Sequence, residues 1–356
     1  MMFLETVPAL TSVWFALIAV LWIGFFFLEG FDFGVAMLMP VIGRSEKERR
    51  LMINTIGPVW DGNEVWLITA GGAMFAAFPG WYATTFSALY LPLLLVLVGL
   101  ILRGVAFEYR QKVSDPRWKT MMDTFAIVGS FLPALVFGIG FANFVVGLPN
   151  DGLLWDGTLL TVFNPFGLLG GLMLVLVCLN HGATFLTLKT RGSVRDKARL
   201  VAGRVGWVTA AVVTAFVVLQ NTFWPAHSEF GHFGSLGWIT AVVAIVATAA
   251  SVTLTRVRRE GWAFLLGGLG IIAIFSGIFL RMYGNLGFAQ DTTVPAGERL
   301  NILTAASSET TLVIMTWATV IFLPLVLAYQ AWTYWVFRKR ISTKNIPDEV
   351  HLEAAA

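Results

Sequence analysis

Residues 91–102 read LPLLLVLVGLIL, a run without a charged side chain. The run belongs to a longer apolar stretch at 82–107, and a helix of about 20 such residues is long enough to cross a bilayer. Comparable stretches recur along the chain, in which 57% of the 356 residues are apolar and only 13% are charged. A soluble fold of this length would have too few polar residues to cover its surface. We therefore predict an all-α, polytopic integral membrane protein, which excludes a nucleic-acid binder, a disordered chain and a disulfide-rich secreted domain.

Nine stretches are apolar and long enough to span a membrane. They run at 10–42, 55–79, 82–107, 120–148, 162–188, 204–224, 234–255, 261–282 and 304–337. Because the connections are short, we expect a single transmembrane domain over 1–356, with 350–356 as a disordered tail or an expression scar. The predicted arrangement is two four-helix bundles plus one further helix. The N-terminus has no basic region and no clear cleavage site, so we expect the first span to be retained.

The basic residues predict how the chain is threaded through the membrane. Of its 24 Lys and Arg residues, 22 fall in alternate connections, and only Arg281 and Arg299 fall in the others. Lys and Arg concentrate in the cytoplasmic connections of membrane proteins. We therefore expect the N-terminus outside and the C-terminus in the cytoplasm, since adding or removing one span would destroy the alternation. The resulting basic face would lie beside anionic membrane lipid.

Two pairs of acidic residues lie within the first two spans, where ionisable side chains are costly and usually functional. Glu29 and Asp32 are in the first span, and Asp61 and Glu64 are in the second. Each pair is spaced i, i+3, which puts both members on one helix face. At 1.5 Å per residue from the expected span ends, Asp32 lies roughly 13 Å and Asp61 roughly 10 Å below the inner surface. Carboxyl groups crowded in this way can take up and release protons.

Three interpretations of these acids are open. They can form a proton-entry route from the cytoplasm, or they can be polar contacts between helices, capped by Asn54 or Asn63. Alternatively, the second pair can lie at the cytoplasmic start of a helix. Arg103, in the third span, either extends toward the inner headgroups or pairs with one of the acids.

No metal or cofactor site is predicted in this chain. His181, beside Asn180, is the histidine that lies inside a span, and one histidine cannot supply both axial ligands of a bis-histidine haem. We expect it to be hydrogen-bonded within the bundle, with a supporting place in the polar network. Cys178, the single cysteine, is expected to be a small apolar residue of the bundle. Glu309 and Asp123 are interpreted as acids near helix N-termini.

Five segments of the chain resemble subunit II of cytochrome bd-type quinol oxidases. They are EGFDFGV at 29–35, ERRLMIN at 48–54, WDGNEVWLITAGGA at 60–73, NPFGLL at 164–169 and MTW at 315–317. The resemblance covers almost the whole chain in order. The segment at 60–73 is long and unusual, so it is specific to this family.

The resemblance implies a haem-free second subunit of a quinol oxidase in the bacterial cell membrane. Such a subunit does not catalyse the reaction by itself. In that family the large subunit carries two b-type haems and one d-type haem, oxidises quinol and reduces oxygen to water, generating proton motive force in aerobic respiration. The small subunit stabilises the complex, a route for cytoplasmic protons runs at the subunit contact, and small accessory subunits can be present. The family's two aspartates match Asp32 and Asp61, and Trp60 matches the aromatic residue that precedes the second of these aspartates. Glu29 stands where relatives often have aspartate, and Glu64 lies beside these positions.

A proton- or cation-coupled secondary transporter and a purely structural scaffold are the alternatives. A transporter would use the acids, but it predicts an internal two-fold repeat, and we find none in the sequence. A scaffold makes the acids dispensable for turnover. Haem d absorbance in the purified protein together with a second subunit would support the oxidase, and a colourless protein alone would support the transporter.

Overall fold

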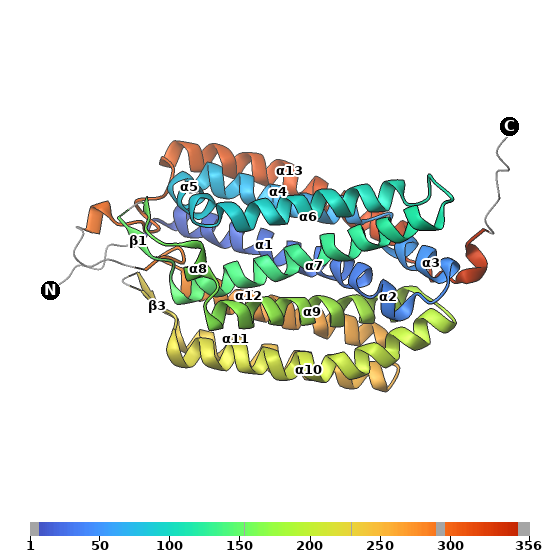
Figure 1. Ribbon diagram of the computed structural model, residues 1–356. Coiled ribbons are helices and arrows are strands. Elements are labelled where there is room, and N and C mark those ends of the chain that lie inside the picture. The colour runs from blue at the N-terminus through green and yellow to red at the C-terminus, as the bar shows by residue number, and fades with distance from the viewer. Residues whose placement is uncertain (1–6, 153, 229, 290–295, 348–356) are drawn as a thin grey trace.

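The computed structural model describes residues 7–152, 154–228, 230–289 and 296–347, and most of them are helical (Figure 1). The long helices are α1 (Ala9–Met37), α4 (Trp60–Ala77), α6 (Tyr90–Tyr109), α7 (Pro116–Val146), α9 (Pro165–Lys189), α10 (Ser193–Phe223), α11 (Gly234–Arg256), α12 (Glu260–Met282) and α13 (Glu309–Val336). The short ones are α2 (Met39–Ile42), α3 (Glu46–Ile56), α5 (Pro79–Ala88), α8 (Leu159–Val162), η1 (Ala296–Glu298) and η2 (Thr343–Asn345). The tail predicted at 350–356 lies outside the described residues.

Two small antiparallel hairpins lie at one end of the helices. They pair β1 (Asn150–Asp151) with β2 (Leu154–Trp155), and β3 (His227–Ser228) with β4 (Gly231–His232). The opposite end holds α3 and the connections at 110–115, 190–192 and 257–259, which carry many of the basic residues (Figure 1). We call it the basic end.

Eight helices among the described residues are long and apolar enough to cross a membrane: α1, α6, α7, α9, α10, α11, α12 and α13. α4 runs beside them from the basic end toward α5 (Figure 1), but it has only 18 residues, and Asp61 and Glu64 are among them. The all-α, multi-pass architecture is therefore confirmed. The full count of nine spans and the orientation of the termini stay predictions.

In two of the expected spans, a proline explains an interruption of the helix. The stretch at 82–107, expected to be one helix, divides into α5 and α6 at Leu89. Pro92 has no N–H to donate to the carbonyl of Ala88, and its ring would collide with that carbonyl in a continuous helix. The stretch at 10–42 breaks at Leu38, where Pro40 occupies the first turn of α2.

The long helices form two groups. In the first, α1 packs on α4 and α7, and α7 packs on α6; in the second, α9, α10, α11 and α12 form a closed bundle. Both α1 and α7 pack on α9, which joins the groups. Gly34 allows the closest approach, because a Cβ there would collide with the backbone of Cys178. α13 lies outside these groups against α1 and α4, and Leu312 is the one residue of this helix that is buried.

Ion pairs hold α3 against both groups at the basic end. Arg110 bonds Glu46 at 2.7 and 2.8 Å and Asp123 at 2.5 Å. Asp123 was expected to act as an acid near a helix N-terminus, but its carboxylate pairs with arginines from two other segments, Arg110 and Arg49.

On the other side of α3, Glu48 accepts hydrogen bonds from Lys197 at 2.8 Å and from Ser193 at 2.7 Å, both on α10. Burial alone would raise the pKa of Glu48, but the hydrogen bonds from Lys197 and Ser193 hold that pKa below its ordinary value. The ionised carboxylate therefore stabilises the contact between α3 and α10.

Candidate functional site: a buried acid–arginine cluster

Glu29 and Asp32 lie together on an inward face of α1. Both side chains are 0% exposed, so the expectation that the i, i+3 spacing puts them on one face is confirmed. Their neighbours Phe31 and Phe33 are also buried. Two acids turned into an apolar bundle need polar partners from other helices, because an unpaired buried charge is unfavourable.

Helix α6 supplies the counter-ion. Arg103 is 0% exposed and forms ion pairs with Glu29 and with Glu64, the second at 3.0 Å between Nη2 and Oε2. Its guanidinium carbon lies 4.7 Å from the ring centre of Phe33 and 5.9 Å from that of Trp60. Arg103 thus pairs with the acids and does not extend to the headgroups, which decides between the two alternatives.

Asn63, on α4, links the cluster to a fourth helix, α13. Its Nδ2 donates to Asp32 Oδ2 at 2.7 Å, and its Oδ1 accepts from Tyr334 Oη at 2.7 Å and from Gln330 Nε2 at 3.4 Å. Tyr334 and Gln330 belong to α13, and the sequence analysis missed them. The available signal was the presence of polar side chains in an otherwise apolar last span. The other oxygen of Asp32, Oδ1, has no hydrogen-bond partner among the described residues.

Asp61 lies at the edge of the cluster. α4 begins at Trp60, so Asp61 occupies its first turn, and its side chain is exposed on the surface of this chain. The structure gives it no hydrogen bond or ion pair with any other residue that it describes. The expected depth of roughly 10 Å below the inner surface stays a prediction, but the span expected at 55–79 is not one continuous helix, because residues 57–59 form a turn between α3 and α4. The alternative that places this acid at a helix start is the one that the structure supports.

The four acids form a series from the surface to the interior. Asp61 is exposed, the side chain of Glu64 is 21% exposed, and Glu29 and Asp32 are fully buried. Three helices contribute to this series and its counter-ion: α1, α4 and α6. Carboxyl groups in such a series can bind and release protons, and one end of the series is open to the surroundings of this chain while the other is enclosed.

His181 is buried but lies outside this cluster. Its Nε2 is 3.0 Å from the carbonyl oxygen of Phe27, and its ring stacks on Phe264 with 4.5 Å between ring centres. The first expectation for this residue, a hydrogen bond inside the bundle, is confirmed. The hydrogen bond goes to the backbone of α1 and not to any of the four acids.

Residues 10–337 match the family described as cytochrome bd terminal oxidase subunit II. The chain belongs to this family. It is 38% identical over 338 residues to cytochrome bd ubiquinol oxidase subunit 2 of Bacillus subtilis (strain 168), covering 95% of this chain and 98% of that one. It is 34% identical over 373 residues to cytochrome bd-I ubiquinol oxidase subunit 2 of Escherichia coli (strain K12), covering 96% and 98%. A chain in the structure of bd oxidase from Geobacillus thermodenitrificans shares the fold, with a TM-score of 0.73 and 17% identity over 93% of this chain and 99% of that one.

Membership of the subunit II family confirms the resemblance seen in the sequence. The chain is a subunit of a membrane quinol oxidase, an oxidoreductase complex, and a multi-pass protein of a bacterial membrane. A second subunit implies a partner, and a cytochrome implies haem in the complex.

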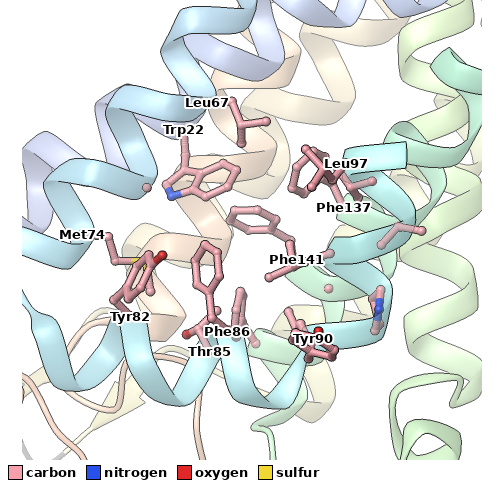
Figure 2. Close-up of a pocket in the computed structure, with 18 of the residues that line it drawn as sticks. Trp22, Leu67, Met74, Tyr82, Thr85, Phe86, Tyr90, Leu97, Phe137 and Phe141 are labelled. Carbon is pink, nitrogen blue, oxygen red and sulfur yellow. The ribbon is translucent and has the colours of Figure 1, made fainter. Parts of the chain in front are cut away.

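The described residues of this subunit II chain do not fit a haem of their own. The Nε2 of His181 is engaged by Phe27, and the cavity beside its ring is only about 10 Å³. A much larger cavity of about 890 Å³ lies among α4, α5, α6 and α7, and Figure 2 shows Trp22, Phe137 and Phe141 beside it. No histidine and no charged side chain is among the described residues that line it. It therefore offers neither a histidine for haem iron nor a carboxylate among the described residues, and it is separate from the acid–arginine cluster.

Proposed function

We propose that this chain stabilises a haem-bearing partner subunit and admits protons from the cytoplasm to the site where that subunit reduces oxygen to water. The observation that carries the proposal is the series of acids from exposed Asp61 through Glu64 to buried Glu29 and Asp32. Acids inside membrane-spanning helices that face the bundle interior are typical of proton relays.

Protons would pass along the acids in order of burial. Asp61 and Glu64 are three residues apart on α4, a spacing that brings their Cβ atoms to about 5–6 Å. Glu64 and Glu29 share the guanidinium of Arg103, which brings their carboxyl groups together. Arg103 keeps its proton in proteins, so it orients the carboxyl groups and does not carry the proton itself. Asp32 Oδ1, which has no partner among the described residues, would receive the proton at the inner end.

A cytoplasmic source of protons makes the reaction electrogenic. Reduction of one oxygen molecule to two waters consumes four protons. If these protons enter from the inside and the electrons come from quinol oxidised near the outer face, charge crosses the membrane without a pump. Each elementary charge moved is worth about 2.3 kcal/mol per 100 mV of membrane potential. The chain would in this way contribute to the proton motive force of aerobic respiration.

The partner subunit would cover the face made by α4, α6 and α13. This face exposes large apolar side chains, among them Ile68, Ile101 and Trp317. It also exposes Asp61, whose carboxylate would find no hydrogen-bond donor in lipid hydrocarbon. A protein partner with a hydrated contact supplies such donors, so we place the subunit contact on this face.

The chemistry with quinol belongs to the partner in this proposal. Two relatives of this chain are named as subunits of ubiquinol oxidases, which supports quinol as the substrate of the complex. The family resemblance assigns two b-type haems and one d-type haem to the large subunit, and small accessory subunits can complete the assembly.

The relay is tested by replacing its two ends in the assembled complex. Asparagine is close in size to aspartate but cannot carry a proton, so Asp32→Asn and Asp61→Asn should each slow quinol-driven oxygen uptake several-fold. The haem absorbance spectrum reports assembly and should stay unchanged in both variants. Uptake is measured as a function of pH with an oxygen electrode.

Asp156→Asn is the matched control, because Asp156 is exposed in the segment between β2 and α8, at the end opposite the basic end. Uptake equal to that of the control across the whole pH range in both Asp32→Asn and Asp61→Asn would reject the relay and favour a scaffold. Purified protein without haem absorbance and without a second subunit would favour a transporter.

A further inference from the structure

The closed bundle of α9, α10, α11 and α12 contains a small polar cavity that the acid–arginine cluster does not use. Its volume is about 10 Å³, and Asn180, His181, Thr209, Thr248 and Gly267 are among the residues that line it. Asn180 and His181 are only 4% and 2% exposed. A space of this size is close to the minimum that one water molecule needs.

The hydrogen bond to Phe27 fixes the state of the His181 ring. A backbone carbonyl can only accept, so Nε2, at 3.0 Å from Phe27 O, must carry the proton. In a neutral imidazole the other nitrogen is then an acceptor. This nitrogen, Nδ1, is buried and has no hydrogen-bond partner among the described residues.

Asn180 presents a second acceptor to the same cavity. Its Oδ1 is also buried without a partner in the described part of the chain. Two acceptors cannot satisfy one another, and buried polar groups in folded proteins nearly always have a partner. A molecule that donates two hydrogen bonds is therefore needed between them.

We propose that one water molecule is bound between α9, α10, α11 and α12, donating one hydrogen bond to His181 Nδ1 and the other to Asn180 Oδ1. The hydroxyl of Thr248 also lines the cavity and can donate to the oxygen of the water. The hydroxyl of Thr209 is already engaged with the backbone carbonyls of Leu176 and Val205, at 3.2 and 3.0 Å.

Glycines from two helices keep this space open. A Cβ on Gly206 of α10 would lie 2.9 Å from Asn180 Oδ1, and a Cβ on Gly267 of α12 would lie 3.7 Å from His181 Nδ1. The ligand is neutral, because no carboxylate is among the described residues that line the cavity, and a buried cation would have no counter-ion from them. The bound water and His181 would then connect the second bundle to Phe27 of α1 by a chain of hydrogen bonds.

The site is tested by brief X-ray radiolysis of the purified complex, followed by mass spectrometry of its peptides. Hydroxyl radicals formed from a bound water oxidise the side chains that touch it, even where bulk solvent has no access. We expect His181 to be oxidised several-fold faster, after correction for intrinsic reactivity, than Phe216, a buried residue of the same bundle that does not line the cavity. Oxidation of His181 at the same low rate as Phe216 would overturn the proposal.

Two glycine substitutions on α12 provide the matched comparison. Gly267→Ala adds a methyl group beside Nδ1 and should lower the oxidation of His181 several-fold. Gly261→Ala adds the same group where nothing lies within 4 Å, and it should leave that oxidation unchanged. If Gly267→Ala prevents assembly, Asn180→Leu removes one acceptor and occupies the same space. If Gly267→Ala or Asn180→Leu assembles and its His181 is still oxidised at the wild-type rate, the proposed water site is contradicted.

Discussion

At the scale of single residues, the acid–arginine cluster is defined by an imbalance of charge. Arg103 is the cation paired with Glu29 and Glu64, and a third acid, the buried Asp32, is bonded among the described residues only to the amide of Asn63. The guanidinium is surrounded by aromatic rings, including Phe33 at 4.7 Å, which strengthens its interaction with the acids by excluding water. With more acids than cations, the cluster carries an excess of negative charge unless one of its carboxyl groups binds a proton.

The ion pair between Arg103 and Glu29 leads to the first prediction at this scale. Arg103→Met leaves Glu29 buried without its counter-ion, and loss of one partner from a buried pair typically costs about 3–5 kcal/mol. We expect a much lower yield of the assembled complex and a lower temperature of inactivation. Combining Arg103→Met with Glu29→Gln removes both charges and should recover a large part of the loss. Haem absorbance per cell and residual oxygen uptake after heating measure both effects.

Arg117→Met serves as the control for this pair, because Arg117 is exposed near the start of α7. Its yield and heat resistance should match those of the unmodified protein. Arg103→Met with the same heat resistance as this control, or a double variant no better than Arg103→Met alone, would contradict the assigned pairing.

Sequence reasoning reached some of these residues and not others, for a physical reason. The shared face of Glu29 and Asp32 follows from helix geometry alone, so their spacing was sufficient. The hydrogen bond from Tyr334 to Asn63 joins positions 271 apart, and no local pattern encodes such a contact. For the same reason, the sequence did not show whether Arg103 pairs with an acid or extends to the headgroups. The outcome depends on how α1, α4 and α6 pack.

At the scale of the elements, α3 acts as a clamp between the two helix groups. Its Glu46 bonds Arg110 after α6, and its Glu48 bonds Lys197 on α10. The capping box formed by Ser45 and Glu48 also fixes the start of this helix. One short helix outside the spanning segments therefore connects elements that are far apart in sequence.

Protonation of Glu48 should weaken this clamp. Its pKa is lowered in the folded protein, so the ionised carboxylate contributes stability above its ordinary value of 4.5, and this contribution is lost as the pH falls through the folded value. Glu48→Gln lacks the contribution at every pH. We expect the variant to be inactivated at a lower temperature than the unmodified complex near pH 7, with the difference shrinking below about pH 4.5. Residual oxygen uptake after heating at each pH, assayed at pH 7, measures this.

Glu108→Gln is a suitable comparison, because Glu108 is an exposed acid near the end of α6. It should behave as the unmodified complex does at every pH. A constant difference between Glu48→Gln and the unmodified complex from pH 7 to pH 4 would show that the carboxylate charge is not what holds α3.

Helix positions were predictable where an apolar stretch ends at charged or turn residues. The stretches expected at 234–255 and 261–282 agree with α11 and α12 to within a residue or so. The break between α5 and α6 was missed, because Leu89 and Pro92 lie inside an otherwise apolar run. α10 begins at Ser193 and not near 204, since a helix can continue into water through charged residues such as Arg195 and Arg199.

At the scale of the whole molecule, the number of spans depends on α4. Apolar composition identifies a span only when the helix faces lipid or an apolar core, and α4 instead carries acids of the buried cluster. The distribution of basic residues gives independent information, because it requires the connections before α4 and after α6 to share one side. The structure places both connections at the basic end (Figure 1). A helix too polar to be recognised by composition can therefore cross the membrane when neighbouring helices cover its polar face.

The last prediction concerns this threading. Cys178 is buried and is the single cysteine, so Arg44→Cys, Ser114→Cys and Asp156→Cys, each combined with Cys178→Ala, create proteins with one exposed thiol. If α4 crosses the membrane and the basic end is cytoplasmic, a membrane-impermeant maleimide added to intact spheroplasts should label position 156 but not 44 or 114. Permeabilised membranes should allow labelling at all three positions. Eight spans without α4 would put positions 44 and 114 on opposite sides, so labelling of one and not the other in intact spheroplasts would refute the ninth span. Labelling of positions 44 and 114 but not 156 would instead show that the chain has nine spans in the opposite orientation.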